Sequence, residues 1–312
     1  MPLPRASAWH CGARLRRVPQ PSTRNWRSVP RTVWALGFVS LLMDVSSEMI
    51  HAFLPVFLVS TLGATPTLVG LIEGIAEGTA SATRVFSGVI SDRVGKRKLL
   101  AVLGYGLGAI TKPVFAIAVT PFEVLAARFA DRVGKGIRGA PRDALVADVT
   151  PTGVRGAAYG VRQALDTTGA LAGPILGIVL LGALNGDMRT VFAIATVPAL
   201  LAVALLMLGV QEPQRSAARS SAPAAPSWEE FRRLARPFWI VAGLGTVFTL
   251  SRFSEAFLVL RAHEVGLALV MVPLVMIAMN VVYALVSAPA GDLSDRIDRR
   301  LVLAAGLVSL IS

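Results

Sequence analysis

Eleven residues, Gly88-Val-Ile-Ser-Asp-Arg-Val-Gly-Lys-Arg-Lys98, decide how the rest of this sequence is interpreted. This short, strongly charged segment lies between two long apolar runs, residues 68–89 and 99–119. An apolar run of about 20 residues is long enough to cross a bilayer as a helix. Two such helices need a water-soluble connection between them. The segment therefore predicts a loop at one membrane surface, with a membrane-spanning helix on each side.

A second copy of this segment occurs far downstream, as Gly291-Asp-Leu-Ser-Asp-Arg-Ile-Asp-Arg-Arg300. It repeats the pattern Gly-x-x-Ser-Asp-Arg, the basic tail and the apolar continuation, with Asp298 in place of the second glycine. Its matching residues are Gly291, Asp295, Arg296, Arg299 and Arg300. A repeat of this kind indicates a chain built from two similar halves.

The first copy resembles the signature loop between the second and third helices of the major facilitator superfamily. The matching residues are Gly88, Asp92, Arg93, Gly95, Lys96 and Arg97, followed by Leu100. The resemblance implies an all-α membrane protein with twelve helices in two six-helix bundles, which transports small molecules. It also implies that Asp92 and Arg93 lock one conformational state rather than bind the substrate.

Composition supports a membrane protein, because the chain is 54% hydrophobic and only 16% charged. The net charge of +12 comes from basic residues in the short connections and in residues 1–32, so we expect no nucleic-acid partner. The single cysteine, Cys11, excludes an internal disulfide. There is no phosphate-binding glycine loop, metal-ligand spacing or nucleophile elbow. We therefore expect no enzyme, no cofactor and no metal.

Apolar runs predict spans over 33–59, 67–90, 99–119, 121–145, 156–183, 189–210, 238–260 and 267–289, and an incomplete one over 301–312. The predicted domains are a basic disordered leader (1–32), a six-helix bundle (33–210), a cytoplasmic linker (211–237) and a partial second bundle (238–312). About twelve residues cannot cross 30 Å of hydrocarbon. We therefore expect the chain to end inside the ninth of twelve spans, and a truncated or regulatory protein that does not transport remains an alternative.

The basic residues alternate between connections, which predicts the orientation of the chain. The connections around residues 93–98, 142–155 and 211–237 are rich in Arg and Lys, whereas the alternate connections carry only Arg189 and Arg261. By the positive-inside rule the amino terminus is cytoplasmic, and we expect a bacterial inner membrane. The Arg-rich, acid-free leader also fits a transit peptide, and this alternative stays open.

Ionisable residues in the first two spans are candidates for proton coupling, because such residues usually face a bundle interior or a wet cavity. Asp44, Glu48 and His51 are spaced by four and three residues and share one helical face. Glu73 and Glu77 share a face of the second span. For Glu73 and Glu77 the alternative is a structural contact with basic residues of the fourth span.

The fourth span carries basic residues along one side and predicts a cavity-lining helix. Asp131 is placed to pair with Lys135 four residues on. Residues 132–139 loosely resemble the superfamily pattern Arg-x-x-Gln-Gly-x-Gly, which implies that Arg132 lines the translocation path and eases proton transfer. The substrate-cavity candidates are Arg128, Lys135, Asp166, Arg252 and Glu255. Arg252 and Glu255 are three residues apart, so the alternative to a role in the cavity is that they neutralise each other.

The fifth span contains Gly169, Gly173, Pro174 and Gly177 in the pattern Gly-x-x-x-Gly-Pro-x-x-Gly. Proline bends a helix by removing a backbone donor, and the glycines let a neighbouring helix pack closely. The pattern resembles one associated with superfamily antiporters, which implies export.

Together these features predict a proton-coupled secondary transporter that exports small organic solutes by alternating access. A buried carboxylate would bind a proton in one state and release it in the other. A proton-coupled importer of sugars or organic anions remains an alternative. Substrate identity, proton or sodium as the coupling ion, and oligomeric state all remain open.

Overall fold

The computed structural model describes residues 28–212, 236–251 and 254–296, together with Leu301, Ala304 and Gly306. Most of the predicted leader, the linker and the last predicted span lie outside these residues. Every regular element in this part is helical, which confirms the predicted all-α class. The helices are α1 (Arg31–His51), α2 (Leu54–Val56), α3 (Pro66–Val94), α4 (Arg97–Ile117), α5 (Pro121–Val149), α6 (Arg155–Ala183), α7 (Met188–Ile194), α8 (Thr196–Gly209), α10 (Arg236–Ser251), α11 (Glu255–Glu264) and α12 (Leu274–Arg296).

Four helical segments of the described part are long and apolar enough to cross a membrane, Arg31–Thr61, Arg97–Ile117, Thr152–Ala183 and Met188–Gly209. The first joins α1, α2 and a π-helical turn, and the last joins α7 and α8. Helices α3 and α5 are equally long, at 29 residues each, but carry more charge. They therefore depend on neighbouring helices to shield their polar side chains.

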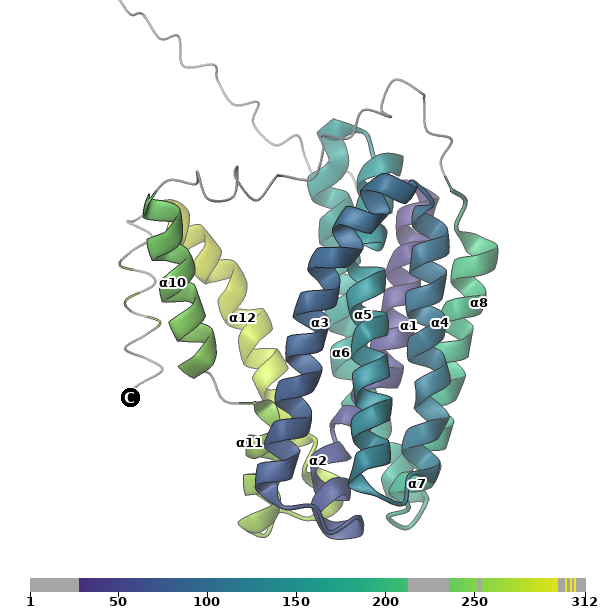
Figure 1. Ribbon diagram of the computed structural model, residues 1–312, viewed down its shortest axis with the longest axis vertical. Coiled ribbons are helices and arrows are strands. Elements are labelled where there is room, and N and C mark those ends of the chain that lie inside the picture. Colours follow the sequence, from purple (N-terminus) through teal and green to yellow (C-terminus); the bar gives the residue numbers. More distant parts are fainter. Residues whose placement is uncertain are drawn as a thin grey trace, which may run out of the picture.

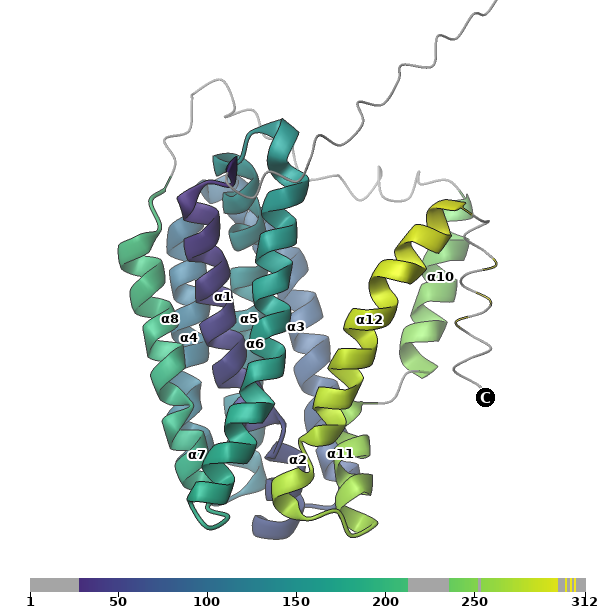
Figure 2. The same ribbon diagram turned by 180° about the vertical axis from the view of Figure 1, so that it is seen from behind.

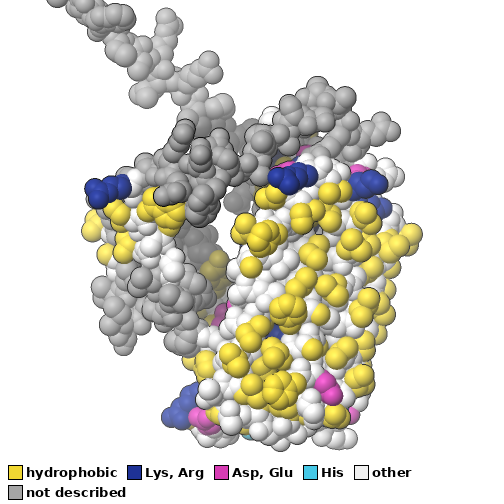
Figure 3. All heavy atoms as spheres, viewed as in Figure 1, with side chains coloured by type: hydrophobic (Ala, Val, Ile, Leu, Met, Phe, Trp, Pro, Cys, Tyr) yellow, Lys and Arg dark blue, Asp and Glu magenta, His cyan; other side chains and the backbone are white. Residues whose placement is uncertain are grey.

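The helices up to α8 form one bundle, drawn in Figures 1 and 2. Helix α1 packs along α6 and α8, and α5 packs along α4 and α3. Apolar side chains on the outside remain uncovered, with Ile110 69% and Leu208 87% exposed. Figure 3 shows such side chains spread over one face, with Lys and Arg gathered towards its two ends. This distribution is the one expected of a surface that faces lipid.

Helices α10, α11 and α12 lie beside the bundle, and α11 and α12 contact it at one end (Figures 1 and 2). Helix α11 packs on α2 and α3, and α12 packs on α6. At the opposite end, where α3 passes into α4, α10 and α12 lie apart from the bundle.

The seventh predicted span, residues 238–260, is wrong as a single helix. Helix α10 ends at Ser251 and α11 begins at Glu255. The hydroxyl of Ser254 accepts a hydrogen bond from the backbone N–H of Ala256 and so caps the start of α11. A serine in this role favours the start of a new helix over continuation of the old one.

The signature segment was predicted as a loop, but most of it is helix. Helix α3 continues to Val94, so Asp92 and Arg93 lie in its last turn. The helix ends at Gly95, whose φ of 73° is the left-handed conformation that glycine adopts most easily. A helix of 29 residues spans about 44 Å, longer than the hydrocarbon layer. Its charged end therefore lies beyond the lipid and has no need to unfold.

Candidate functional site

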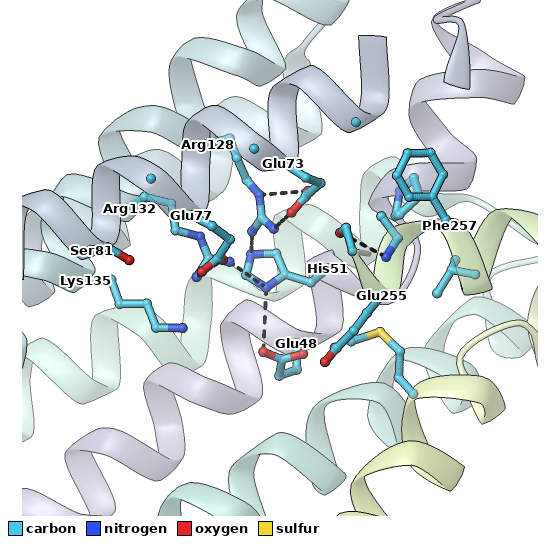
Figure 4. A pocket seen from close by; sticks show the side chains of 18 residues that line it. Glu48, His51, Glu73, Glu77, Ser81, Arg128, Arg132, Lys135, Glu255 and Phe257 are labelled. Atoms are coloured by element: carbon cyan, nitrogen blue, oxygen red, sulfur yellow. Dashed lines mark hydrogen bonds and ion pairs between the residues drawn. The ribbon is translucent and has the colours of Figure 1, made fainter. Parts of the chain in front are cut away.

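A cavity of about 870 Å³ lies between the bundle and the segment that contains α11 and α12. Helices α1, α3 and α5 supply its charged wall, and α11 and α12 supply the facing side. Figure 4 shows the lining side chains, which include Glu48, His51, Glu73, Glu77, Arg128, Arg132 and Lys135 from the bundle and Glu255 and Phe257 from α11. Because the wall is crowded with charges, the cavity suits a polar occupant better than an apolar one.

Glu73 of α3 and Arg128 of α5 form a two-pronged ion pair in this wall. Nε and Nη2 of Arg128 donate to the two carboxylate oxygens of Glu73 at 3.1 and 2.5 Å. Glu73 is 7% and Arg128 4% exposed. The alternative role for Glu73 was a structural contact with a basic residue of the fourth predicted span, and this ion pair is such a contact. The role of Glu73 in proton coupling stays a prediction.

Glu77 and Arg132 form a second, weaker pair one helical turn further along. Their closest nitrogen and oxygen lie 3.3 Å apart, and the Glu77 side chain is 64% exposed. An ion pair with one solvated partner contributes little to stability. Glu77 is therefore available to water in the cavity, whereas Glu73 is held by Arg128.

A smaller cavity of about 310 Å³ adjoins the first, and Glu48 and Lys135 line both. Basic residues outnumber acidic ones in its wall, with Arg84, Lys135, Arg138, Arg142 and Arg162 against Asp44, Glu48 and Asp166. Asp166 accepts from Arg162 at 2.5 Å and also lies 3.8 Å from Arg142. Among the residues that the structure describes, Asp44 and Lys135 have no ion-pair partner within 4 Å.

The glycine motif of α6 packs directly against the acidic part of α1. A β-carbon added at Gly169 would lie 2.7 Å from the carbonyl oxygen of Leu41 and 3.0 Å from Cβ of Asp44. One added at Gly177 would lie 2.8 Å from the ring of Phe53. Only glycine lets α6 approach α1 this closely, and the contact fixes the position of the α1 backbone that carries Asp44 and Glu48.

The predicted pair of Asp131 and Lys135 is wrong, and the sequence did not reveal the buried pair that Asp131 forms instead. Asp131 pairs with Lys112 of α4, not with Lys135, and Oδ1 accepts from Nζ at 2.8 Å. Lys112 also donates to Ser47 of α1 at 3.0 Å. The lysine is completely buried and Asp131 is 2% exposed. A lysine in the middle of an apolar span, next to Pro113, was the available signal for this contact.

At the signature segment, Arg97 connects α3, α4 and α5. It donates to Asp148 of α5 at 2.5 Å, to the carbonyl oxygen of Ala144 at 3.0 Å and to Asp92 at 3.3 Å. Of the second copy, Gly291, Asp295 and Arg296 belong to the end of α12, and their side chains are outside the description. Arg252, Arg299 and Arg300 lie outside the described residues.

A family profile and several relatives match most or part of this chain. The sequence profile of the Major Facilitator Superfamily matches residues 36–312. The uncharacterized MFS-type transporter MJ1317 of Methanocaldococcus jannaschii is 32% identical over 295 residues, which are 93% of this chain and 72% of that protein. The multidrug resistance protein MdtH of Edwardsiella ictaluri is 28% identical over 142 residues, 46% of this chain and 35% of that protein.

Solved structures agree on the fold. A bacterial homologue of the human lysosomal transporter Spinster, in an inward-facing and occupied conformation, superposes with a TM-score of 0.69 at 18% identity. That match covers 86% of this chain and 62% of the other. A POT family transporter in complex with 5-aminolevulinic acid matches with a TM-score of 0.54 at 16% identity, over 78% of this chain and 50% of that one. The chain thus spans between half and two thirds of the length of these solved transporters.

Proposed function

Because this chain belongs to the Major Facilitator Superfamily, we propose that it is a proton-coupled secondary transporter that exports small organic solutes. Membership of the family makes it an integral membrane transport protein and not an enzyme. The proposal adds the direction, the coupling ion, a bacterial inner membrane and a cytoplasmic amino terminus. It also includes the division into a six-helix bundle (33–210), a linker (211–237) and a second bundle.

The observation that carries the proposal is the position of Asp44 and Glu48 against the glycine motif of α6. Both carboxylates line the smaller cavity, and Glu48 lines the larger one as well. Asp44 has no ion-pair partner among the described residues, and the contact of Glu48 is with His51. Carboxylates that no Arg or Lys holds are able to exchange protons with water in the cavity.

The mechanism follows from competition at these carboxylates. In the state seen here, the two parts meet near α2 and α11 and lie apart at the other end (Figures 1 and 2). In the proposed cycle this state takes up the solute from the cytoplasm, where the solute would displace the proton from Asp44 or Glu48. Rocking to the opposite state would release the solute and let a proton bind from outside. The MdtH relatives are named multidrug resistance proteins, which supports export.

Flux measurements in proteoliposomes test the proposal. With the internal pH reported by a trapped dye, we would add ethidium, glycylglycine or succinate as cationic, zwitterionic and anionic probes. We expect one probe to exchange for protons, and Asp44→Asn and Glu48→Gln to abolish the pH change. The control is Glu264→Gln, which removes a carboxylate with a 56% exposed side chain on α11. Solute movement that persists unchanged when the pH gradient is collapsed would refute proton coupling.

A second candidate, proton-coupled import of an organic anion, is favoured by Lys135 and the basic majority in the smaller cavity. An anion bound to Lys135 would favour protonation of the nearby Glu48 and Asp44, so anion and proton would move together. Under this candidate succinate enters the vesicles with protons, and Lys135→Gln reduces the uptake. No flux of any probe in either direction would favour the alternative of a protein that does not transport.

The orientation is tested with cysteine labelling, because Cys11 is the only cysteine in the chain. In a Cys11→Ser background, Gly153→Cys and Val119→Cys place a thiol at opposite ends of the bundle, both at exposed positions. In intact cells a membrane-impermeant maleimide should label the cysteine at 119 and spare the one at 153. The reverse pattern would place the amino terminus outside.

A further inference from the structure

Acidic side chains of α3 and basic side chains of α5 pair in a constant register. Glu73 pairs with Arg128, which lies 55 positions later in the chain. Glu77 pairs with Arg132 at the same separation. Both acids and both bases are one helical turn apart, so the pairs follow each other along two helices that run in the same direction. The two guanidiniums of α5 that face the larger cavity are thus matched by carboxylates of α3.

The same register brings Arg84 of α3 to a position without a carboxylate. Its counterpart on α5 is Gly139, where an added β-carbon would lie 3.4 Å from Nε of Arg84. The guanidinium therefore lies over the α5 backbone, at the wall of the smaller cavity. Among the residues that the structure describes, Arg84 has no ion-pair partner within 4 Å. The alternation of acid and base between α3 and α5 ends here, and two basic helix faces meet.

Lys135 and Arg138 of α5 add to this positive charge. Both line the smaller cavity, and neither has an ion-pair partner within 4 Å in the described part of the chain. Arg138 is 5% exposed and lies over the ring of Tyr105 at 4.7 Å. Its Nη1 has no acceptor among the described protein groups. Buried donors are normally satisfied, so an anionic group in this cavity would stabilise a cluster that the protein leaves unbalanced.

The two adjoining cavities differ in the sign of their charge. Glu48 and Lys135 line both, and Figure 4 draws these two side chains without an ion pair between them. The other charged residues of the larger cavity are mostly acidic, with Glu73, Glu77 and Glu255 against Arg128 and Arg132. Those of the smaller cavity are mostly basic, with Arg84, Arg138, Arg142 and Arg162 against Asp44 and Asp166. A solute that spans the boundary would meet opposite fields at its two ends.

We propose that the exported solute is amphoteric, with a carboxylate that binds Arg84 and Lys135 in the smaller cavity and a protonated amine that binds Glu48. Guanidinium and ammonium groups form strong charge-assisted hydrogen bonds with a carboxylate. The solute amine is the matching donor for Glu48, and it would replace the proton there. The inference deepens the proposed function and rests on it for the direction of transport, since it names the class of the solute and the groups that bind each end.

Equilibrium binding tests the solute class without any transport. Protein in lipid nanodiscs is titrated by calorimetry with β-alanine, γ-aminobutyrate and ε-aminocaproate, which differ in the separation of their two charges. Butylamine and butyrate are the controls that carry one charge each. We expect at least one of the amino acids to bind about ten times more tightly than either control. Butyrate that binds as tightly as every amino acid would overturn the proposal and leave a plain anion site. No preference for any amino acid over butylamine would overturn it as well.

Variants at the two ends separate their roles. Arg84→Gln should weaken binding of the preferred amino acid by about 10- to 100-fold, the effect of losing a charge-assisted hydrogen bond. This variant should bind the amino acid no better than butylamine, whereas Glu48→Gln should bind it no better than butyrate. Unchanged affinity for the amino acid in both folded variants would contradict the proposed site.

Folding is controlled within the same set of variants. Because Arg84 has no carboxylate partner among the described residues, Arg84→Gln leaves no buried charge unpaired and should fold. Arg84→Lys keeps the positive charge and should restore most of the affinity. The matched control is Arg261→Gln, which removes a guanidinium from a side chain that is 72% exposed on α11. It should bind the amino acid as the parent protein does.

Binding and flux give separate answers. If an amino acid binds with the expected preference but no probe exchanges for protons in vesicles, the proposed function fails and the solute class stands. If ethidium exchanges for protons and does so equally well in Arg84→Gln, the solute class is wrong and the proposed function stands.

Discussion

Gly173 of α6 lies directly against Glu48 of α1. A β-carbon added at Gly173 would lie 2.6 Å from Cβ of Glu48 and 2.9 Å from the carbonyl oxygen of Val45. Neither atom belongs to the flexible end of a side chain, so the helices themselves would have to separate. A motif that resembles one associated with superfamily antiporters is thus in physical contact with a carboxylate that lines both cavities.

The first prediction is that Gly173→Ala lowers stability by about 1–3 kcal/mol, because it overpacks this contact. The matched control is Gly160→Ala on the same helix, where an added β-carbon meets no atom within 4 Å. That change should be neutral or stabilising by up to about 1 kcal/mol, since alanine favours helix over glycine. Unfolding in detergent measures both, and equal effects at the two positions would show that the close contact is absent in solution.

The second prediction concerns the Glu73–Arg128 pair. Glu73→Gln or Arg128→Gln alone should each cost about 3–5 kcal/mol, because each leaves a buried charge without its partner. The double variant should cost clearly less than the sum of the two. As a control, the exposed pair Arg261–Glu264, with side chains 72% and 56% exposed, should lose less than about 1 kcal/mol. Additive losses at Glu73 and Arg128 would mean that the two side chains do not interact.

The third prediction concerns the approach of α4 to α5. A β-carbon at Gly104 would lie 2.6 Å from the carbonyl oxygen of Gly134 and 2.7 Å from the backbone nitrogen of Arg138. Gly104→Ala should therefore destabilise the protein by at least about 1–3 kcal/mol. Gly106, on the same helix, has no atom within 4 Å of an added β-carbon, and Gly106→Ala should be tolerated. Thermal unfolding of the two variants gives the comparison, and a tolerated Gly104→Ala would contradict the close approach of these two backbones.

The fourth prediction separates stability from transport at the signature segment. Asp148 lies 2.5 Å from Arg97 with a 20% exposed side chain, whereas Asp92 lies 3.3 Å away and is 60% exposed. Asp148→Asn should therefore cost about 1–3 kcal/mol, and Asp92→Asn less than about 1 kcal/mol.

If Asp92 locks one state, as the family resemblance implies, Asp92→Asn should abolish transport while insertion and abundance stay near normal. Vesicle flux and the amount of protein in the membrane are measured on the same preparations. Normal flux in Asp92→Asn would remove the lock function from this residue and leave Arg97–Asp148 as a purely structural contact.

The sequence located most helices well, because a long apolar run has few alternatives to a helix in lipid. It failed where a single residue decided the outcome. Ser254 caps a new helix inside an apolar run, and the charged end of α3 stays helical up to Gly95. Asp131 shows a different failure, since spacing offered Lys135 as a partner and the structure gives it Lys112 from another helix.

The sequence by itself determined the helical class, the family and which charges share a face of one helix, because the helical period fixes the direction of each side chain about its own axis. Only the tertiary structure decided which charges meet. Glu73 forms an ion pair with Arg128, His51 lies between Arg128 and Glu48, and Gly173 packs against Glu48. These contacts depend on how each helix is rotated and how closely it packs against its neighbours, and both result from interactions between residues far apart in the chain.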